Sequence, residues 1–366
     1  MTTAPAPRWT RWLADPRVQA RMARLPLVRR LVRREGEALF DLVAGFCHSQ
    51  VLMALVRLDL PAQLLERRSD TATLATRCAM PDRGMELLLR AADALGLVRQ
   101  RRGLWRLTPR GAALAGVPGL AGMIDHHEVL YRDLADPVAF FRGEVETELA
   151  GFWPYVFGAG AAKDPETAAR YSRLMADSQA LVAEDTLSVL DLSDSDEVLD
   201  VGGGTGAFLA ALGARHARPR LTLFDLPAVV PSAEARFAAA DLSARARIVP
   251  GSFREDLLPK GADTLTLVRV LYDHADDTVR PLLVAARDAL PPGGRIVVSE
   301  PMTGDRRPER AGDAYYALYC HAMRTGHARS PGRITALLAE AGFSDLRTPP
   351  APRPFVTRVV TGVRQG

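Results

Sequence analysis

The chain has little of what marks several common classes of protein. Its three cysteines, Cys47, Cys78 and Cys320, lie far apart and form no Cys-x-x-Cys pair. This spacing argues against a zinc site and a disulfide framework, and it favours a reducing compartment. No uninterrupted apolar run in the sequence approaches the roughly 20 residues of a membrane span, and the early charges at Arg11 and Asp15 do not suit a signal peptide. These absences predict a cytoplasmic protein without a metal site.

An excess of charge of either sign is also lacking. There are 47 basic and 43 acidic residues, which leaves a net charge of +4. Such a balance creates no overall field for nucleic acid, although Arg29, Arg30, Arg33 and Arg34 crowd one segment near the N-terminus. A length of 366 residues exceeds what one hydrophobic core usually holds and therefore predicts two domains.

The first half of the chain has the patterns of helices. Leu39, Leu42, Val43 and Phe46 recur at the spacing of one helix face. Two helical segments and two short alternating runs then follow within 71–114, which is the plan of a winged helix-turn-helix. Because the helix expected at 83–95 offers few side chains suited to base edges, we favour a scaffold or dimer module over DNA binding.

Aromatic residues gather after this segment. They are Tyr131, Phe140, Phe141, Phe152, Trp153, Tyr155 and Phe157. Such clusters usually belong to a core, but their place just before the second domain also suits the wall of an apolar pocket.

In the second half, strands alternate with helices. The strands are expected at 198–201, 221–224, 247–249, 264–270 and 296–299, and the helices at 207–216, 228–239 and 278–290. This rhythm predicts a doubly wound parallel sheet, and two last runs at 346–348 and 356–363 suggest a closing hairpin. We therefore predict a helical domain over 1–185, with the winged-helix segment at about 70–115, and a Rossmann-like α/β domain over 186–366.

The most specific motif is Val198–Gly206, where a buried strand ends in a glycine-rich turn that opens a helix. Asp225 ends the next strand about 20 residues later, where a carboxylate can accept both hydroxyls of an adenosine ribose. A nicotinamide site has similar glycine spacing, but Asp200 before the first glycine would repel its diphosphate. An acidic residue there suits a cationic amino-acid cofactor, S-adenosylmethionine.

Taken together, the motifs resemble those of the caffeate-type class I O-methyltransferases. The motifs are the glycine turn, Phe224–Pro227, Pro250–Phe253, Leu290–Arg295 and the winged-helix plan. The resemblance covers nearly the whole chain after the first few tens of residues. It implies a homodimer with interlocking helical domains, and a substrate pocket between the two domains.

Three further segments resemble those of a smaller group within this family. Arg269–Asp277, Ser299–Met302 and Ala322–Gly326 are similar to the bacterial members that methylate the tertiary hydroxyl of a 1-hydroxycarotenoid. This implies a hydrophobic small-molecule substrate. An aromatic polyketide or a chlorin stays open as the substrate, and a DNA-binding regulator stays open as a function of another class.

The resemblance also implies which residues surround S-adenosylmethionine. Those expected at its methionine and ribose are Asp200, Gly202, Gly204 and Asp225, and those expected elsewhere around it are Leu226, Ser252, Phe253 and Arg269. Leu226 would flank the adenine, with Phe253 beside the ring. Ser252 departs from the family's usual aspartate at the adenine amine, but it can still accept one hydrogen bond.

Methyl transfer to a hydroxyl also needs a group that takes or shares its proton. Most plant members of the family use a histidine where this chain has Tyr272. A tyrosine with an ordinary pKa near 10 suits an orienting group better than a base at neutral pH. Asp273, His274 and His321 are the other candidates for this role.

The first 34 residues interleave tryptophans with arginines. Basic segments that contain tryptophan can lie on an anionic membrane surface, so we predict a peripheral membrane contact. A solvated helix against the dimer is the alternative.

Overall fold

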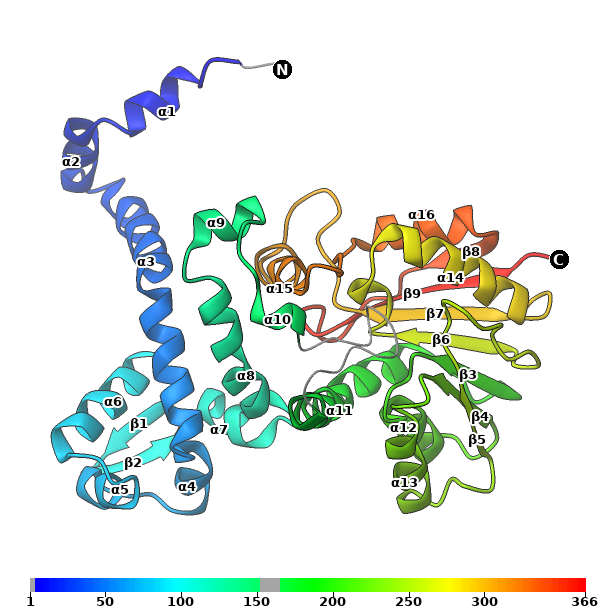
Figure 1. The fold of residues 1–366 in the computed structure, drawn as a ribbon. Coiled ribbons are helices and arrows are strands. Elements are labelled where there is room, and N and C mark those ends of the chain that lie inside the picture. Colours follow the sequence, from blue (N-terminus) through cyan, green and yellow to red (C-terminus); the bar gives the residue numbers. More distant parts are fainter. Residues whose placement is uncertain (1–3, 152–164) are drawn as a thin grey trace. The chain divides into compact units, whose positions relative to one another are not determined.

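The computed structural model describes residues 4–151 and 165–366, without the side chains of 165–175 and 177. The expected aromatics Phe152, Trp153, Tyr155 and Phe157 lie outside the described residues. Two compact units make up the chain, Met1–Gly116 and Val117–Gly366 (Figure 1).

The first unit is helical with one small hairpin. Its elements are α1 (Arg8–Leu13), α2 (Pro16–Arg24), α3 (Arg29–Arg57), α4 (Leu60–Glu66), α5 (Thr71–Arg77), α6 (Asp82–Ala94), β1 (Val98–Arg101), β2 (Leu104–Leu107) and α7 (Pro109–Gly116). Asp70 caps α5 by accepting the Thr73 N–H at 2.8 Å, and β1 pairs antiparallel with β2. The order of α5, α6, β1 and β2 confirms the winged-helix plan.

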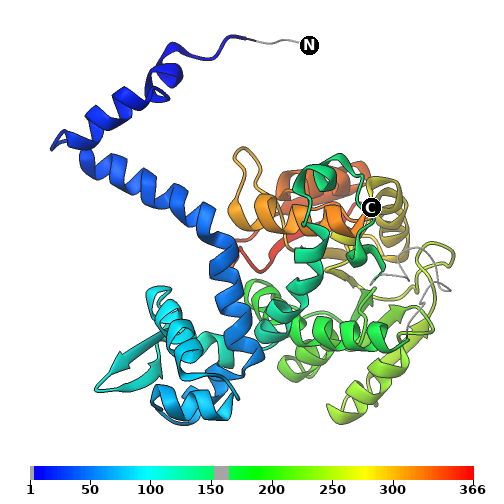
Figure 2. The same cartoon turned by 60° about the vertical axis from the view of Figure 1, so that its left-hand side comes forward.

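Helix α3 corrects one expectation from the sequence. It is continuous over 29 residues (Figure 2), and by length and composition it is apolar enough to cross a membrane. The apolar character of this long helix is hard to recognise in the sequence, because small and polar residues interrupt the apolar ones. Leu39, Leu42 and Phe46 are exposed on this unit, whereas Met53 and Leu55 enter its core. An exposed apolar face of this size marks an interaction site.

The second unit combines helices with a seven-stranded sheet. Its helices are α8 (Leu120–Asp133), α9 (Pro137–Arg142), α10 (Glu148–Gly151), α11 (Pro165–Val189), α12 (Ala207–Arg215), α13 (Pro231–Ala239), η2 (Leu271–Asp273), α14 (Asp276–Ala289), η3 (Gly312–Tyr316), α15 (Ala317–Met323) and α16 (Pro331–Glu340). Its strands are β3 (Glu197–Val201), β4 (Arg220–Asp225), β5 (Ala246–Pro250), β6 (Thr264–Val268), β7 (Arg295–Glu300), β8 (Phe343–Arg347) and β9 (Arg358–Arg364).

The strand order is β5-β4-β3-β6-β7-β9-β8. The first five of these run parallel, β9 runs antiparallel to β7, and β8 and β9 form the expected hairpin. Side chains alternate between the two faces, so Val198 joins the core under α11, α12 and α13, whereas Leu199 joins the core under α14 and α16. The predicted doubly wound α/β sheet is confirmed.

The boundary between the units lies after Gly116, whereas the sequence analysis placed it near residue 185. Helices α8 and α10 contact α15, and α11 contacts α12. Phe140 and Leu149 share one buried cluster with Tyr319 and Met323. The change of rhythm near residue 197 therefore marks the start of the sheet, because the helices before it bury their apolar faces in the second unit.

Candidate active site

The glycine turn follows β3 at the carboxyl edge of the sheet. Gly202, Gly204 and Gly206 have φ angles of 70°, 59° and 72°, in the left-handed region that favours glycine. A Cβ atom on Gly203 would lie 2.3 Å from Asp200 Oδ2. The turn therefore needs glycine for its conformation and for its close packing, and its backbone is left open to a ligand.

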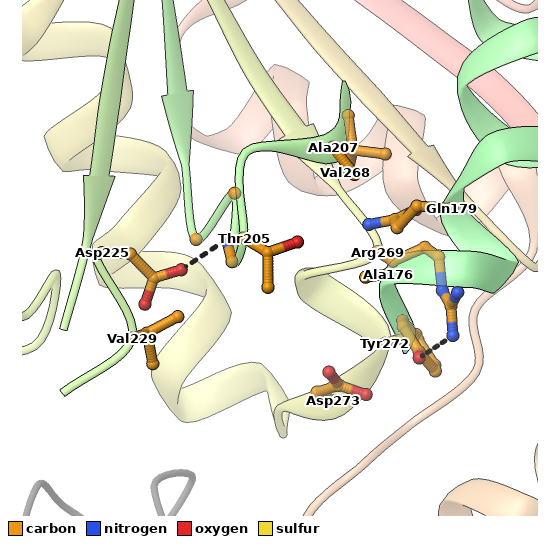
Figure 3. A pocket seen from close by; sticks show the side chains of 13 residues that line it. Ala176, Gln179, Thr205, Ala207, Asp225, Val229, Val268, Arg269, Tyr272 and Asp273 are labelled. Carbon is orange, nitrogen blue, oxygen red and sulfur yellow. Dashed lines mark hydrogen bonds between the residues drawn. The ribbon is translucent and has the colours of Figure 1, made fainter. Parts of the chain in front are cut away.

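Asp225 faces this turn from the end of β4 (Figure 3). Its Oδ2 accepts the Gly204 N–H at 2.7 Å, and its Oδ1 accepts the Leu226 N–H at 2.7 Å. Burial raises the pKa of Asp225, and the two backbone hydrogen bonds oppose that rise. The carboxylate is thus fixed in orientation at the edge of the sheet.

Arg269 leaves the end of β6 with a φ angle of 58°, which is unusual for a residue with a side chain. Its Nη1 donates to Ser178 Oγ at 2.7 Å, and its Nη2 donates to the Tyr272 hydroxyl at 3.3 Å. The guanidinium carbon lies 5.9 Å from the centre of the Tyr272 ring. This strained backbone position brings the cation and the phenol together.

These groups share one cavity, and every described residue that lines it belongs to the second unit. The lining residues are Ala176, Gln179, Gly202, Gly203, Gly204, Thr205, Ala207, Asp225, Val229, Val268, Arg269, Tyr272 and Asp273. Figure 3 shows Asp225 and Val229 on one side, with Gln179, Arg269 and Tyr272 on the other. The cavity therefore spans the ends of β3, β4 and β6.

Acidic groups in and behind the cavity are poorly solvated. Burial raises the pKa of Asp273 well above its usual range, and repulsion by Glu300 adds to this, against the charge of Arg269. Within the described part of the chain, Asp273 Oδ1 has no hydrogen-bond partner. Glu300 accepts the Tyr272 N–H at 3.0 Å, and burial raises its pKa to about 7. A base of raised pKa therefore faces the cavity.

The short turn η2, which carries Tyr272 and Asp273, is held by the buried guanidinium of Arg329. Arg329 donates to the carbonyls of Leu271 and His274, both at 2.8 Å. Its Nε donates to Asp276 Oδ1 at 2.8 Å, and its side chain is 0% exposed. One cation therefore ties both ends of the turn to the start of α14.

Not every residue expected at the cofactor lines this cavity. Asp200 is buried beneath the glycine turn, where Oδ1 accepts from Thr266 at 2.5 Å. Leu226 follows Asp225 outside the lining residues. Ser252 and Phe253 follow β5, also outside the lining, and the Phe253 ring packs against His274 with centres 5.3 Å apart. These four positions surround the site without forming the described wall.

His321 does not share the cavity with Tyr272 and Asp273. Its Nε2 lies 3.1 Å from the carbonyl oxygen of Phe140, which can only accept, so the imidazole donates there. Its ring contacts the Phe140 ring edge-on, with centres 4.9 Å apart. In the described structure His321 joins α15 to α9 and faces a separate hollow.

Sequence reasoning missed three contributors to the site. Ala176 and Gln179 reach the wall from α11, and Arg329 holds η2 from a position far along the chain. The helix that carries Ala176 and Gln179 contains no motif, so its periodicity alone gives no signal. Arg329 follows the Ala322–Gly326 segment, and only its burial reveals its role.

A doubly wound sheet with an antiparallel strand beside β7, a glycine turn after β3 and a carboxylate at the end of β4 is the arrangement of the S-adenosylmethionine-dependent methyltransferases. The structure of human N-acetylserotonin methyltransferase in complex with S-adenosylmethionine supports this class. It superimposes with a TM-score of 0.76 at 26% identity, over 91% of this chain and 98% of that one.

The sequence then places the chain in one family. Residues 131–344 match the O-methyltransferase domain, and residues 40–116 match the O-methyltransferase dimerisation domain. This chain belongs to that family of O-methyltransferases, and the second match supports a homodimer. The cofactor of the family is S-adenosylmethionine.

Two relatives are much more similar in sequence than this solved structure. Demethylspheroidene O-methyltransferase of Rhodobacter capsulatus is 51% identical over 97% of this chain and 89% of its own length. The protein of the same name from Cereibacter sphaeroides is 53% identical, over 95% of this chain and 92% of its own length.

The residues of the cavity fit S-adenosylmethionine. This cofactor carries a cationic sulfur, an ammonium group and two ribose hydroxyls, all of which seek acceptors or negative charge. Gln179 Oε1 and Asp273 Oδ1 are buried acceptors without a hydrogen-bond partner among the described residues, and Asp225 adds a carboxylate. The glycine turn leaves its backbone uncovered beside them.

The hydrogen bonds by which Arg329 holds η2 predict an effect on stability. Arg329→Met should lower the free energy of unfolding by about 3–5 kcal/mol, because it leaves buried carbonyls and Asp276 without this cation. Arg329→Lys should cost less, since it keeps the charge. Urea unfolding of each variant measures the change.

A matched control is Arg347→Met, because Arg347 is exposed and pairs with Asp345 on the surface. We expect that change to cost below about 1 kcal/mol. Equal destabilisation by Arg329→Met and Arg347→Met would contradict the conclusion that Arg329 stabilises η2.

Proposed function

We propose that this enzyme methylates the tertiary hydroxyl of a 1-hydroxycarotenoid such as hydroxyneurosporene or demethylspheroidene. The observation that carries the proposal is the identity of 51% and 53% to two demethylspheroidene O-methyltransferases, over nearly the whole length of this chain. A long polyene of this kind is apolar and dissolves in membranes, so the proposal includes a peripheral contact of the enzyme with a membrane.

The helices beside the cavity support an apolar substrate. His126 Nε2 lies 2.9 Å from the Tyr319 hydroxyl, and His127 Nε2 lies 2.6 Å from the Tyr315 hydroxyl. Because these hydroxyls are already paired, the two tyrosines offer little to a polar substrate. Asp313 already accepts hydrogen bonds from two backbone N–H groups in its own loop, so its carboxylate does not need a polar substrate as a partner.

We assign the ribose hydroxyls of the cofactor to Asp225, and the ammonium group to the buried acceptor Gln179. Gly202 and Gly204 supply open backbone between them. Leu226, Ser252 and Phe253 lie at the ends of β4 and β5, on the side where the adenine would extend from Asp225. Asp200 lies beneath the turn, where its Oδ1 accepts from Thr266 and its Oδ2 packs so close to Gly203 that a side chain there would clash.

When bound, S-adenosylmethionine supplies a methyl group on a positively charged sulfur. Asp273 accepts the proton of the substrate hydroxyl, because its carboxylate is buried and its pKa is raised. Tyr272 orients the hydroxyl: burial raises its pKa well above 10, so its phenol stays protonated and can donate a hydrogen bond. Arg269 fixes the phenol from the other side.

The assignment of Asp225 predicts a defect in cofactor binding. Asp225→Ala should weaken the binding of S-adenosylmethionine by about 1–3 kcal/mol, because polar groups of the cofactor lose their acceptor. Calorimetry measures the affinity, and Asp194→Ala, an exposed aspartate far from the cavity, is the control. Unchanged affinity in Asp225→Ala, with the fold intact, would refute the assignment.

The assignment of Asp273 predicts a pH dependence. The carboxylate is the active form, so kcat/KM should fall as the pH drops through its raised pKa, well above the usual value of about 4. Asp273→Asn should lower kcat by about 10²- to 10⁴-fold and remove this acid limb. Tyr272→Phe should lower kcat but keep the limb. An Asp273→Asn enzyme with the wild-type rate and limb would exclude Asp273 as the acceptor.

The substrate assignment is tested by direct competition. Purified enzyme with labelled S-adenosylmethionine should methylate a 1-hydroxycarotenoid in detergent, but not an anthracycline phenol or bacteriochlorophyllide. Mass spectrometry should place one added methyl on the tertiary oxygen. Methylation of either other acceptor, with none of the carotenoid, would overturn the substrate and leave the methyltransferase standing.

A further inference from the structure

The N-terminal segment, defined here as Arg8–Arg34, has an unusual composition. It contains nine arginines and a single acidic residue, Asp15. It also precedes the part of the chain that matches the dimerisation domain, which begins at residue 40. The segment is therefore an addition to that domain, and its surface calls for a separate explanation.

Helix α1 carries its tryptophans and its arginines on different sides. Trp9 and Trp12 are three residues apart, which places them on one side of the helix, and they are 63% and 56% exposed. Arg8 and Arg11 have the same spacing and lie on the neighbouring side. Two exposed indoles next to two guanidinium groups form an amphipathic surface.

Helix α2 continues this arrangement. Val18 and Met22 are half-buried, whereas Arg17, Arg21 and Arg24 are exposed on the neighbouring side. The loop that follows exposes Leu25 and Leu27, the latter to 96%. The segment thus presents cations and large apolar side chains to the same solvent.

The positive charge of this surface is largely uncompensated. Arg33 pairs with Glu37, and Arg34 pairs with Glu35. None of the other seven arginines forms an ion pair with a carboxylate among the residues that the structure describes. A binding partner with many negative charges would therefore be attracted to the whole length of the segment.

We propose that the N-terminal segment binds a membrane surface that contains anionic phospholipids. Indole rings favour the interface between water and lipid, and arginines attract anionic headgroups, so this partner satisfies both kinds of side chain. A second copy of the chain fits less well, because it brings the same positive charge to the contact. The inference rests on the proposed function for its purpose, which is access to an apolar substrate.

Flotation of the purified full-length protein with vesicles tests the proposal without substrate. One set of vesicles is phosphatidylcholine alone, and the other contains about 30% phosphatidylglycerol. We expect binding only to the anionic vesicles, with release by about 0.5 M salt, because screening weakens surface attraction. The double variant Trp9→Ala/Trp12→Ala and the triple variant Arg17→Gln/Arg21→Gln/Arg24→Gln should each bind at least about fivefold more weakly.

The control is Arg101→Gln/Arg102→Gln/Arg106→Gln, which removes the same charge from the exposed β1–β2 hairpin. It should bind like the wild type, and light scattering should give all proteins the same mass. Equal binding by wild type and N-terminal variants would overturn the proposal. So would binding that resists salt, as expected if α3 inserts, or a loss of dimer without vesicle binding. Turnover in detergent tests the proposed function separately.

Discussion

The parallel pairing of β3 with β4 on one side and β6 on the other shapes the whole site. The helix after β3 packs on one face of the sheet, and the helix after β6 packs on the opposite face. The chain therefore leaves neighbouring strands in opposite directions, and a crevice opens at their carboxyl ends. The glycine turn, Asp225 and Arg269 all meet there because Asp225 ends β4, and the other two directly follow β3 and β6.

In the mechanism that we propose, catalysis in this crevice depends on buried charge that is held in place. Arg329 fixes the carbonyls of η2, Glu300 accepts a backbone N–H of the same turn, and Asp273 is thereby kept in a site with little water. A carboxylate in such a place is a stronger base than one on the surface. The stability of η2 and the reactivity that we propose for Asp273 therefore have one physical cause.

Local patterns made the core of the site predictable. Val198–Gly206 and Asp225 are recognisable from a few adjacent residues. Their positions at the ends of β3 and β4 were therefore predicted correctly, as were the parallel strands. Contacts between distant segments were not predictable in this way. Gln179 reaches the cavity from a helix without a motif, and Asp200 turns under the glycines toward Thr266.

Helix registers and domain boundaries were harder still. The π-helical turn Gly312–Tyr316 alters the register just before α15, so spacing could not tell that His321 would face Phe140. The boundary after Gly116 depends on which unit buries α8–α11, and the composition of the chain does not show that.

The proposed mechanism depends above all on Asp273 receiving the proton of a carotenoid hydroxyl. A crystal structure with S-adenosylhomocysteine and a 1-hydroxycarotenoid tests it most directly: we predict about 2.6–3.2 Å between the hydroxyl oxygen and the Asp273 carboxylate, and a separation beyond about 5 Å without a bridging water would contradict it.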